Sequence, residues 1–129
     1  MTQTKTLTIT GFVLSGLFVL FMAMDIVIKL IHLPIVATTL QALGWPPEMG
    51  FVIGVIELIC VALYIYPRTA VLGALLMTAV LGGAIATHLR IGSPLFSHIL
   101  FGVYLGLFMW GGLWLRSERL RTILPMQTS

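Results

Sequence analysis

The sequence predicts an all-α, polytopic membrane protein built as an antiparallel bundle of four transmembrane helices. Hydrophobic residues make up 59% of the 129 residues, only 9% are charged, and mean hydropathy is +1.10. So few charged side chains cannot cover a soluble domain of this size, whereas lipid as the solvent removes that need. The apolar runs are continuous rather than alternating, which argues against strands because an open sheet edge cannot lie in lipid.

Four segments approach the roughly 20 apolar residues that a helix needs to cross the hydrocarbon core. The links after the second and third segments are short, and Pro67 in "YPRT" interrupts the chain between two of them. Such links require antiparallel neighbours. We therefore predict a single domain over residues 1–129, with spans at about 7–31, 49–66, 70–88 and 97–115 and a short basic tail at 116–129.

The first span follows one positive charge, Lys5, and ends in "MAMDIVIKLIH", which lacks a small-x-small signal-peptide cleavage site. We expect it to be retained. The long connection that follows has room for a short interfacial helix at 35–43 after Pro34, which Gly44 would end. Trp45 suits the headgroup level of the membrane. The second span then begins after the double proline.

Small residues in the remaining spans predict close helix packing, because they let backbones approach in lipid. Gly50 and Gly54 are four residues apart, as are Gly102 and Gly106. The third span contains Gly73, Ala74, Gly82, Gly83 and Ala84. This pattern fits a compact bundle and equally a dimer face.

The distribution of lysine and arginine favours an orientation with both termini in the cytoplasm, since basic residues accumulate on that side. The predicted cytoplasmic side carries Lys5, Arg68, Arg116, Arg119 and Arg121, and the opposite side carries Lys29 and Arg90. The first connection and the "RIGSP" loop would then face outward. Because the basic residues are scattered, they do not indicate a nucleic-acid partner.

Ionisable side chains inside spans are costly and usually face the bundle interior. Asp25 and Lys29 are four residues apart and share a helix face, which His32 continues. Glu57 lies eight residues into the second span, roughly 12 Å deep at 1.5 Å per residue. All four spans would bring polar groups to one outward-facing region, so the predicted site consists of Asp25, Lys29, His32, Glu57, His88, Arg90 and His98.

Structural interpretations of these residues stay open. Asp25 and Lys29 would tolerate burial as a neutralised pair, and Lys29 and His32 are long enough to extend to the interface. An unpaired Glu57 at this depth would be protonated or paired with a cation, which suits either a functional role or a structural ion pair.

His88, Arg90 and His98 end or begin a span, where an interfacial anchor or a helix cap is the alternative to a site role. His88 and Arg90 differ by about 200° around an ideal helix. They therefore cannot both point inward unless the helix ends between them.

No self-contained catalytic motif is present, so catalytic residues are unknown and the chain is not expected to be an enzyme. His88 and His98 are ten residues apart, which matches no compact metal motif, and we expect no metal and no evident cofactor. Cys60 is the only cysteine, so it forms no internal disulfide, and we expect it to be a small packing residue.

Aromatic residues gather near the predicted interfaces. Trp110, Trp114, Tyr64 and Tyr66 are predicted to form an aromatic belt on the inner side. Trp45 and Phe96 at the outer side would line the entry of an apolar ligand or serve as belt residues.

Several segments resemble the DoxX-like family of small bacterial four-helix membrane proteins. They are "GWPP", "GVIELICVALYIYPRTAVLGALL", "GGAIATHLRIGSPLF" and "GLWLR", between about Asp25 and Pro125. The positions that carry the resemblance are Glu57, Pro67, Arg68, Gly82, Gly83, Thr87, His88 and Arg90. The resemblance implies a four-helix fold in a bacterial inner membrane. Family members are similar to membrane subunits of quinone-linked sulfur oxidation and redox-stress complexes, and distant animal relatives to chaperones of ligand-gated channels.

Three functions remain open on this basis. The first is binding of a quinone or lipid-like molecule, whose polar head would meet Glu57, His88 and Arg90, in the membrane subunit of a redox-linked complex. The second is a membrane assembly or chaperone-type protein, in which the polar cluster is structural. A proton or small-solute transporter ranks below both. Expected partners are the lipid bilayer, a membrane or peripheral redox protein, and a second copy of the chain.

Overall fold

Helices are the regular elements of the computed structural model, which describes residues 2–127 and the side chains from Lys5 onward. The helices are α1 (Thr2–Leu30), α2 (Pro34–Ala42), α3 (Met49–Ile65), α4 (Ala70–Arg90), α5 (Phe101–Arg116) and α6 (Glu118–Arg121). A 3₁₀ turn, η1 (Pro67–Thr69), precedes α4, and a π-helical turn, η2 (Leu95–Ile99), precedes α5. The all-α prediction is confirmed for these residues.

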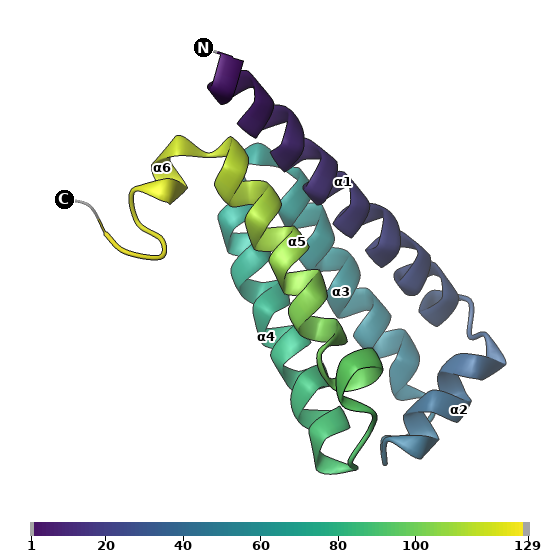
Figure 1. Ribbon diagram of the computed structural model, residues 1–129. Coiled ribbons are helices and arrows are strands. Elements are labelled where there is room, and N and C mark those ends of the chain that lie inside the picture. Colours follow the sequence, from purple (N-terminus) through teal and green to yellow (C-terminus); the bar gives the residue numbers. More distant parts are fainter. Residues whose placement is uncertain (1, 128–129) are drawn as a thin grey trace.

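Four helices stand side by side and form a ring (Figure 1). α1 packs against α3 and α5, and α4 packs against the same two helices from the other side of the ring. α2 lies at one end of the bundle, beside the start of α3, whereas α6 lies at the other end, beside the end of α5. Each of these four helices therefore has two neighbours, and together they enclose a narrow core.

The core consists of apolar side chains that recur at helical spacing. Phe18, Met22 and Ile26 follow one another every fourth residue on α1 and are buried. Met77 of α4 and Met109 of α5 are fully buried in the same cluster. Flexible methionine side chains fill irregular space between helices, which suits a core this thin.

Large apolar side chains also cover the outside of the bundle. Leu20, for example, is 69% exposed, and similar side chains lie exposed on α3, α4 and α5. Soluble proteins rarely expose so extended an apolar surface, but lipid solvates it. By length and composition, three helical stretches within residues 2–127 can cross a membrane: Lys5–Leu30, Pro67–Arg90 and Leu95–Arg116. Met49–Ile65 is a shorter apolar helix. The chain is therefore a membrane protein.

The connections fix how the helices turn. The predicted short helix in the first connection is present as α2, and Gly44 follows it with a φ of +83°. The Trp45 N–H donates to the Leu40 carbonyl at 2.8 Å, and the Gly44 N–H to the Gln41 carbonyl at 3.1 Å. This pair of bonds closes a helix end on a left-handed residue, usually glycine. The chain thus turns sharply from α2 toward α3.

Several helix bounds differ from the predicted spans, beginning with α1, which starts at Thr2 rather than at about residue 7. α4 continues through Arg90 instead of ending at His88, and α5 begins only at Phe101, after the π-helical turn. The basic tail contains α6, a short helix that the residue pattern did not predict. The Trp114 indole N–H donates to the Leu124 carbonyl at 2.8 Å, which holds the tail against α5.

Of the two alternatives for Gly82 and Gly83, close packing within the bundle and a dimer face, the first is not observed. A Cβ atom at either position would meet nothing within 4 Å. α4 packs instead through Gly73 and Leu81. Gly82 and Gly83 lie about 100° and 200° around the helix from Leu81 and so point away from the bundle. At Gly73 the contact is with α3 backbone, since a Cβ there would lie 2.8 Å from the Cys60 carbonyl oxygen.

Candidate functional site

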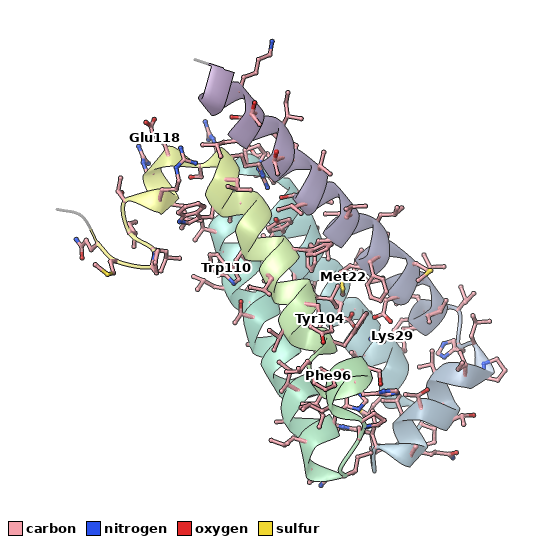
Figure 2. The ribbon with its side chains drawn as sticks, in the orientation of Figure 1. Met22, Lys29, Phe96, Tyr104, Trp110 and Glu118 are labelled. Atoms are coloured by element: carbon pink, nitrogen blue, oxygen red, sulfur yellow. The ribbon has the colours of Figure 1, made fainter. Side chains whose placement is uncertain are left out.

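Charged residues of α1 and α3 form a connected group, the charged triad of Asp25, Lys29 and Glu57. The Lys29 Nζ donates to Asp25 Oδ2 at 2.7 Å and also to Glu57 Oε1 on the neighbouring helix. Only 3% of the Glu57 side chain is exposed, against 20% for Lys29 and 26% for Asp25. Figure 2 shows Lys29 near the end of α1 that leads to α2. One ammonium group therefore joins two carboxylates across the helix interface.

Gly54 brings the two helices together at this level. A Cβ at Gly54 would lie 3.0 Å from the Lys29 Cβ and 3.3 Å from Leu30 Cδ2. Gly54 precedes Glu57 by three residues, so both lie on the same side of α3. The missing side chain thus places Lys29 within reach of the buried carboxylate.

The charges of the triad do not balance when all three groups are ionised, because two carboxylates share one ammonium. A buried charge is tolerated only when it is paired and hydrogen-bonded. Removing one partner of such a pair destabilises a protein by more than the intact pair stabilises it, since an uncompensated charge is left. The arrangement can therefore hold α1 and α3 in register.

A second group, the histidine pair, brings together His88 at the end of α4 and His98 in η2. Their ring centroids are 5.5 Å apart and the ring planes are inclined by 67°. His88 Nδ1 lies 3.0 Å from Ser93 Oγ, and His98 Nδ1 lies 2.7 Å from Ser97 Oγ. Gly92, with a φ of +71°, turns the chain after α4. This turn lets residues ten apart in the sequence meet.

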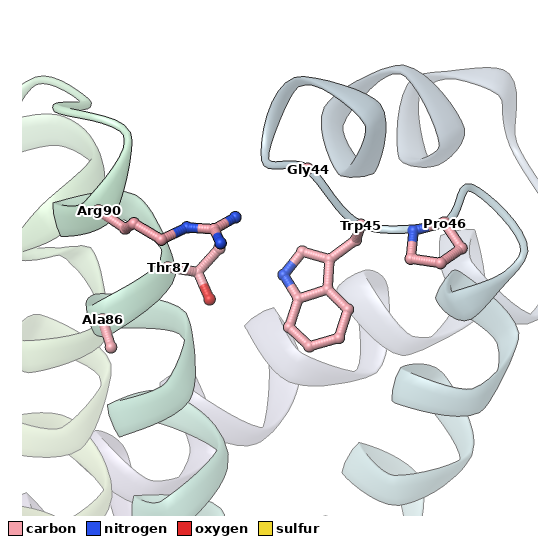
Figure 3. Close-up of a pocket in the computed structure, with 6 residues that line it drawn as sticks. All are labelled: Gly44, Trp45, Pro46, Ala86, Thr87 and Arg90. Carbon is pink, nitrogen blue, oxygen red and sulfur yellow. The ribbon is translucent and has the colours of Figure 1, made fainter.

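A groove of about 470 Å³ opens between the end of α4 and the loop that joins α2 to α3 (Figure 3). Arg90 and Thr87 on one side face Trp45 and Pro46 on the other. The Arg90 Nη2 donates to the Leu43 carbonyl at 3.0 Å and so connects the two sides. The lining residues are Gly44, Trp45, Pro46, Ala86, Thr87 and Arg90.

The side chains of His88 and Arg90 point to different parts of the structure, because α4 does not end between them. Two further residues turn the helix by about 200°. His88 accordingly meets His98, whereas Arg90 reaches the Leu43 carbonyl. The condition under which both side chains would point inward, a helix end between them, is therefore not met.

His32 stands apart from the other predicted site residues. It is exposed, has a φ of +60°, and stacks on Phe51 with ring centroids 5.5 Å apart. The Leu33 N–H donates to the Ile28 carbonyl at 3.2 Å, so His32 occupies the left-handed position that ends α1. The predicted polar cluster is thus divided among the charged triad, the histidine pair, the groove with Arg90, and the isolated His32.

A buried hydrogen-bond network that the residue pattern did not predict lies at the other end of the bundle. The Tyr64 hydroxyl donates to the Met109 carbonyl at 2.6 Å and lies 2.8 Å from Ser15 Oγ. Because a carbonyl only accepts, the Ser15 hydroxyl must donate to Tyr64. The Arg116 Nε in turn donates to Ser15 Oγ at 3.2 Å. The hydrogen bonds therefore run in one direction from a cation at the helix end to the core.

The assignment of Tyr64 to an aromatic belt is wrong, since only 1% of this residue is exposed. Tyr64 follows Glu57 by seven residues, which places both on one face of α3. That spacing was the available signal of an inward position.

The potential metal ligands and the one thiol of the described residues lie as follows. Among residues 2–127, no group of three or more histidine, cysteine, aspartate or glutamate residues is placed to hold a metal ion. Cys60 is a free thiol buried in the core, which confirms its predicted packing role.

Comparison with known families matches residues 13–112 to the DoxX-like family. The matched range includes the charged triad, the histidine pair and the groove. Neither the curated proteins nor the solved structures give a match.

Proposed function

The chain belongs to the DoxX-like family, and from this premise we propose that it binds the polar head of a lipid-like molecule in the groove beside Arg90. The observation that carries the proposal is the groove itself, which joins a cationic side chain to an apolar wall. A lipid-like molecule has the same two parts, an oxygen-bearing head and an apolar tail.

Arg90 supplies the donors for such a head. A guanidinium has five N–H donors in a planar fork that suits carboxylate, phosphate or carbonyl oxygens. One Arg90 donor is engaged by the Leu43 carbonyl. The Thr87 hydroxyl donates to the Gly83 carbonyl, so its oxygen remains an acceptor for a hydroxyl group of the ligand. The groove can therefore satisfy both kinds of polar atom.

The size of the groove supports a head group rather than a whole lipid. Small-molecule sites usually measure about 300–1,000 Å³, and this one measures about 470 Å³. Trp45 and Pro46 provide apolar surface on one side. The tail of the ligand would continue along the exposed apolar faces of the bundle.

We further propose four spans in a bacterial inner membrane, with both termini in the cytoplasm and the groove facing outward. The positive charges of the flanks support this orientation. α3 has 17 residues and is about 25 Å long at 1.5 Å per residue, slightly less than the roughly 30 Å hydrocarbon core. A short span of this kind is accommodated by local thinning of the bilayer.

A quinone is the ligand that would link the groove to redox chemistry. Its carbonyl oxygens would accept from Arg90, and its isoprenoid tail would remain in lipid. The chain would then act as the membrane subunit of a redox-linked complex, with electrons supplied by a partner protein.

Native mass spectrometry of the purified protein would test the proposal, with phosphatidylglycerol, phosphatidylcholine and a short-chain quinone as probes. Arg90→Gln removes a charged hydrogen-bond donor, which is worth about 1.5–3 kcal/mol. We expect at least one probe to bind wild type and to bind this variant roughly 10–100-fold more weakly.

Arg68→Gln is the matched control, because Arg68 is an exposed arginine in η1, at the other end of α4. This variant should bind as the wild type does. Equal binding by wild type and Arg90→Gln would contradict the proposal.

The open face of α4 favours a second function, docking of a partner helix in an assembly role. Gly82 and Gly83 are both exposed, and a Cβ atom added at either one would meet nothing within 4 Å. Small residues of this kind let helices approach closely in lipid. In this interpretation the charged triad is purely structural.

Crosslinking in native membranes from a cysteine at position 83, in a Cys60→Ser background, would test the assembly role. A discrete crosslinked partner would support it. A cysteine at position 16, where Gly16 is equally open, is the control, and the same products from both positions would contradict the α4 face.

A further inference from the structure

We propose that His88 and His98 form a binding site for a transition-metal ion of the imidazole-preferring class, copper or zinc. Sequence spacing alone does not suggest such a site, because ten residues and a loop separate the two histidines. The turn after α4 nevertheless brings their ring centroids to 5.5 Å.

The ring separation matches that of two imidazoles on one ion. Zinc–nitrogen bonds are about 2.0–2.1 Å long, so two coordinated rings have centroids roughly 5–6 Å apart. The observed separation falls within this range. Binding would therefore require rotation of side chains and little movement of the backbone.

The serine contacts leave the outer nitrogen of each ring available. Ser93 Oγ and Ser97 Oγ contact the Nδ1 atoms, and neither Nε2 has a hydrogen-bond partner among the described residues. A hydroxyl oxygen can accept from Nδ1–H, which leaves Nε2 unprotonated. Metal-binding histidines are commonly oriented in this way, by a hydrogen bond from the other ring nitrogen to an oxygen atom.

Backbone hydrogen bonds hold the site in shape. The Ser93 N–H donates to the His88 carbonyl at 3.0 Å, and the Gly92 N–H donates to the Leu89 carbonyl at 3.2 Å. The His98 N–H donates to the Pro94 carbonyl at 3.0 Å. One histidine and its serine thus belong to the same closed turn, while the other histidine is fixed by the π-helical turn.

Two protein ligands define an open site rather than a closed structural one. The remaining coordination positions would hold water or an external ligand. The positive charge of Arg90 does not face the ion directly, since its guanidinium turns toward the Leu43 carbonyl. Copper is favoured over zinc by the usual order of affinities for nitrogen ligands.

The test is a Cu²⁺ titration of the purified chain without a polyhistidine tag, followed by calorimetry and electron paramagnetic resonance. We expect one ion per chain, with hyperfine coupling to two nitrogens, and displacement of Cu²⁺ only by excess Zn²⁺. Ser93→Ala keeps both imidazoles and should weaken binding by about 10–100-fold, as loss of an outer hydrogen-bond partner does. His88→Asn and His98→Asn should each weaken it further.

His32→Asn is the control, because His32 is exposed and lies apart from the pair. This variant should bind Cu²⁺ as wild type does. Circular dichroism and gel filtration would establish that each variant is folded, and if His88→Asn is not, His98→Asn and Ser93→Ala decide. No binding by wild type, or undiminished binding by folded His98→Asn, would overturn the proposal.

Discussion

At Lys29, a single ammonium group contacts both Asp25 and Glu57. Lys29→Met would leave Glu57 buried beside another carboxylate and without a cation. Breaking a buried pair by removing one partner costs about 3–5 kcal/mol, so we expect a loss of this size in the free energy of unfolding. Glu57→Gln removes the unbalanced charge and keeps the Asp25–Lys29 contact, so it should cost less. Unfolding in mixed micelles with increasing sodium dodecyl sulfate would measure both.

Lys5→Met is the control for loss of a lysine from the same helix, since Lys5 is exposed. A surface substitution of this kind usually changes stability by less than about 0.5 kcal/mol. If Lys29→Met is no more destabilising than Glu57→Gln, Lys29 does not act as the shared cation of the two carboxylates.

The residue patterns predicted some contacts and not others. The four-residue spacing identified the Asp25–Lys29 pair, because it is a property of one helix. The contact with Glu57 depends on how deeply α3 sits against α1, which the Gly54 contact sets. The histidine pair depends on a turn, and sequence spacing does not specify the path of a turn.

At the level of helices, Gly73 of α4 packs directly against the backbone of α3. A Cβ there would meet the Tyr64 backbone and the Cys60 carbonyl oxygen. Neither is the end of a flexible side chain, so the helices would have to separate. We expect Gly73→Ala to destabilise the protein by about 1–3 kcal/mol, the usual cost of overpacking, as a lower thermal midpoint in detergent.

Gly82→Ala is the matched control in the same helix, because a Cβ there meets nothing within 4 Å. Alanine is the better helix former by about 1 kcal/mol, so this variant should be as stable as wild type or more stable. A similar loss in both variants would contradict the packing argument.

Gly73 and Gly82 also show that the sequence alone does not determine which face of a helix is buried. They are nine residues apart, which is half a turn out of phase, so they lie on opposite faces of α4. Both are small and apolar, and nothing local tells which face is inside. The existence of each helix was predictable from its apolar run, but its rotation depends on its neighbours.

For the molecule as a whole, the length of α3 bears on which bilayer thickness the protein matches. Its 17 residues are shorter than the three stretches long enough to cross a membrane. The charged triad and the Gly54 contact hold α3 to α1, so α3 cannot shift freely toward either surface. Hydrophobic mismatch costs fractions of a kcal/mol per Å. We therefore expect thermal stability to be highest in thinner bilayers.

Reconstitution into phosphatidylcholine bilayers with acyl chains of 14, 18 and 22 carbons, with melting followed by circular dichroism, would measure this dependence. Stability should fall as the chains lengthen. A maximum in the thickest bilayer would contradict the prediction.

The composition predicted a membrane protein, because a chain with only 9% charged residues cannot cover its surface with polar groups and needs lipid as its solvent. The order of helices around the ring was only partly predictable. The tight "YPRT" link makes α3 and α4 neighbours. The long first connection leaves the place of α1 open, and the contact between α1 and α5 closes the ring through packing alone.

The charged triad also bears on how the protein is made. The ribosome completes α1 before α3, and the N-terminal part of a chain generally folds first. Because Asp25 and Lys29 lie on the same helix, α1 can enter the bilayer with these charges already neutralised. Glu57 arrives afterwards and meets its cation on a helix that is already in place. The order of synthesis is thus the order in which each charge acquires its counter-ion.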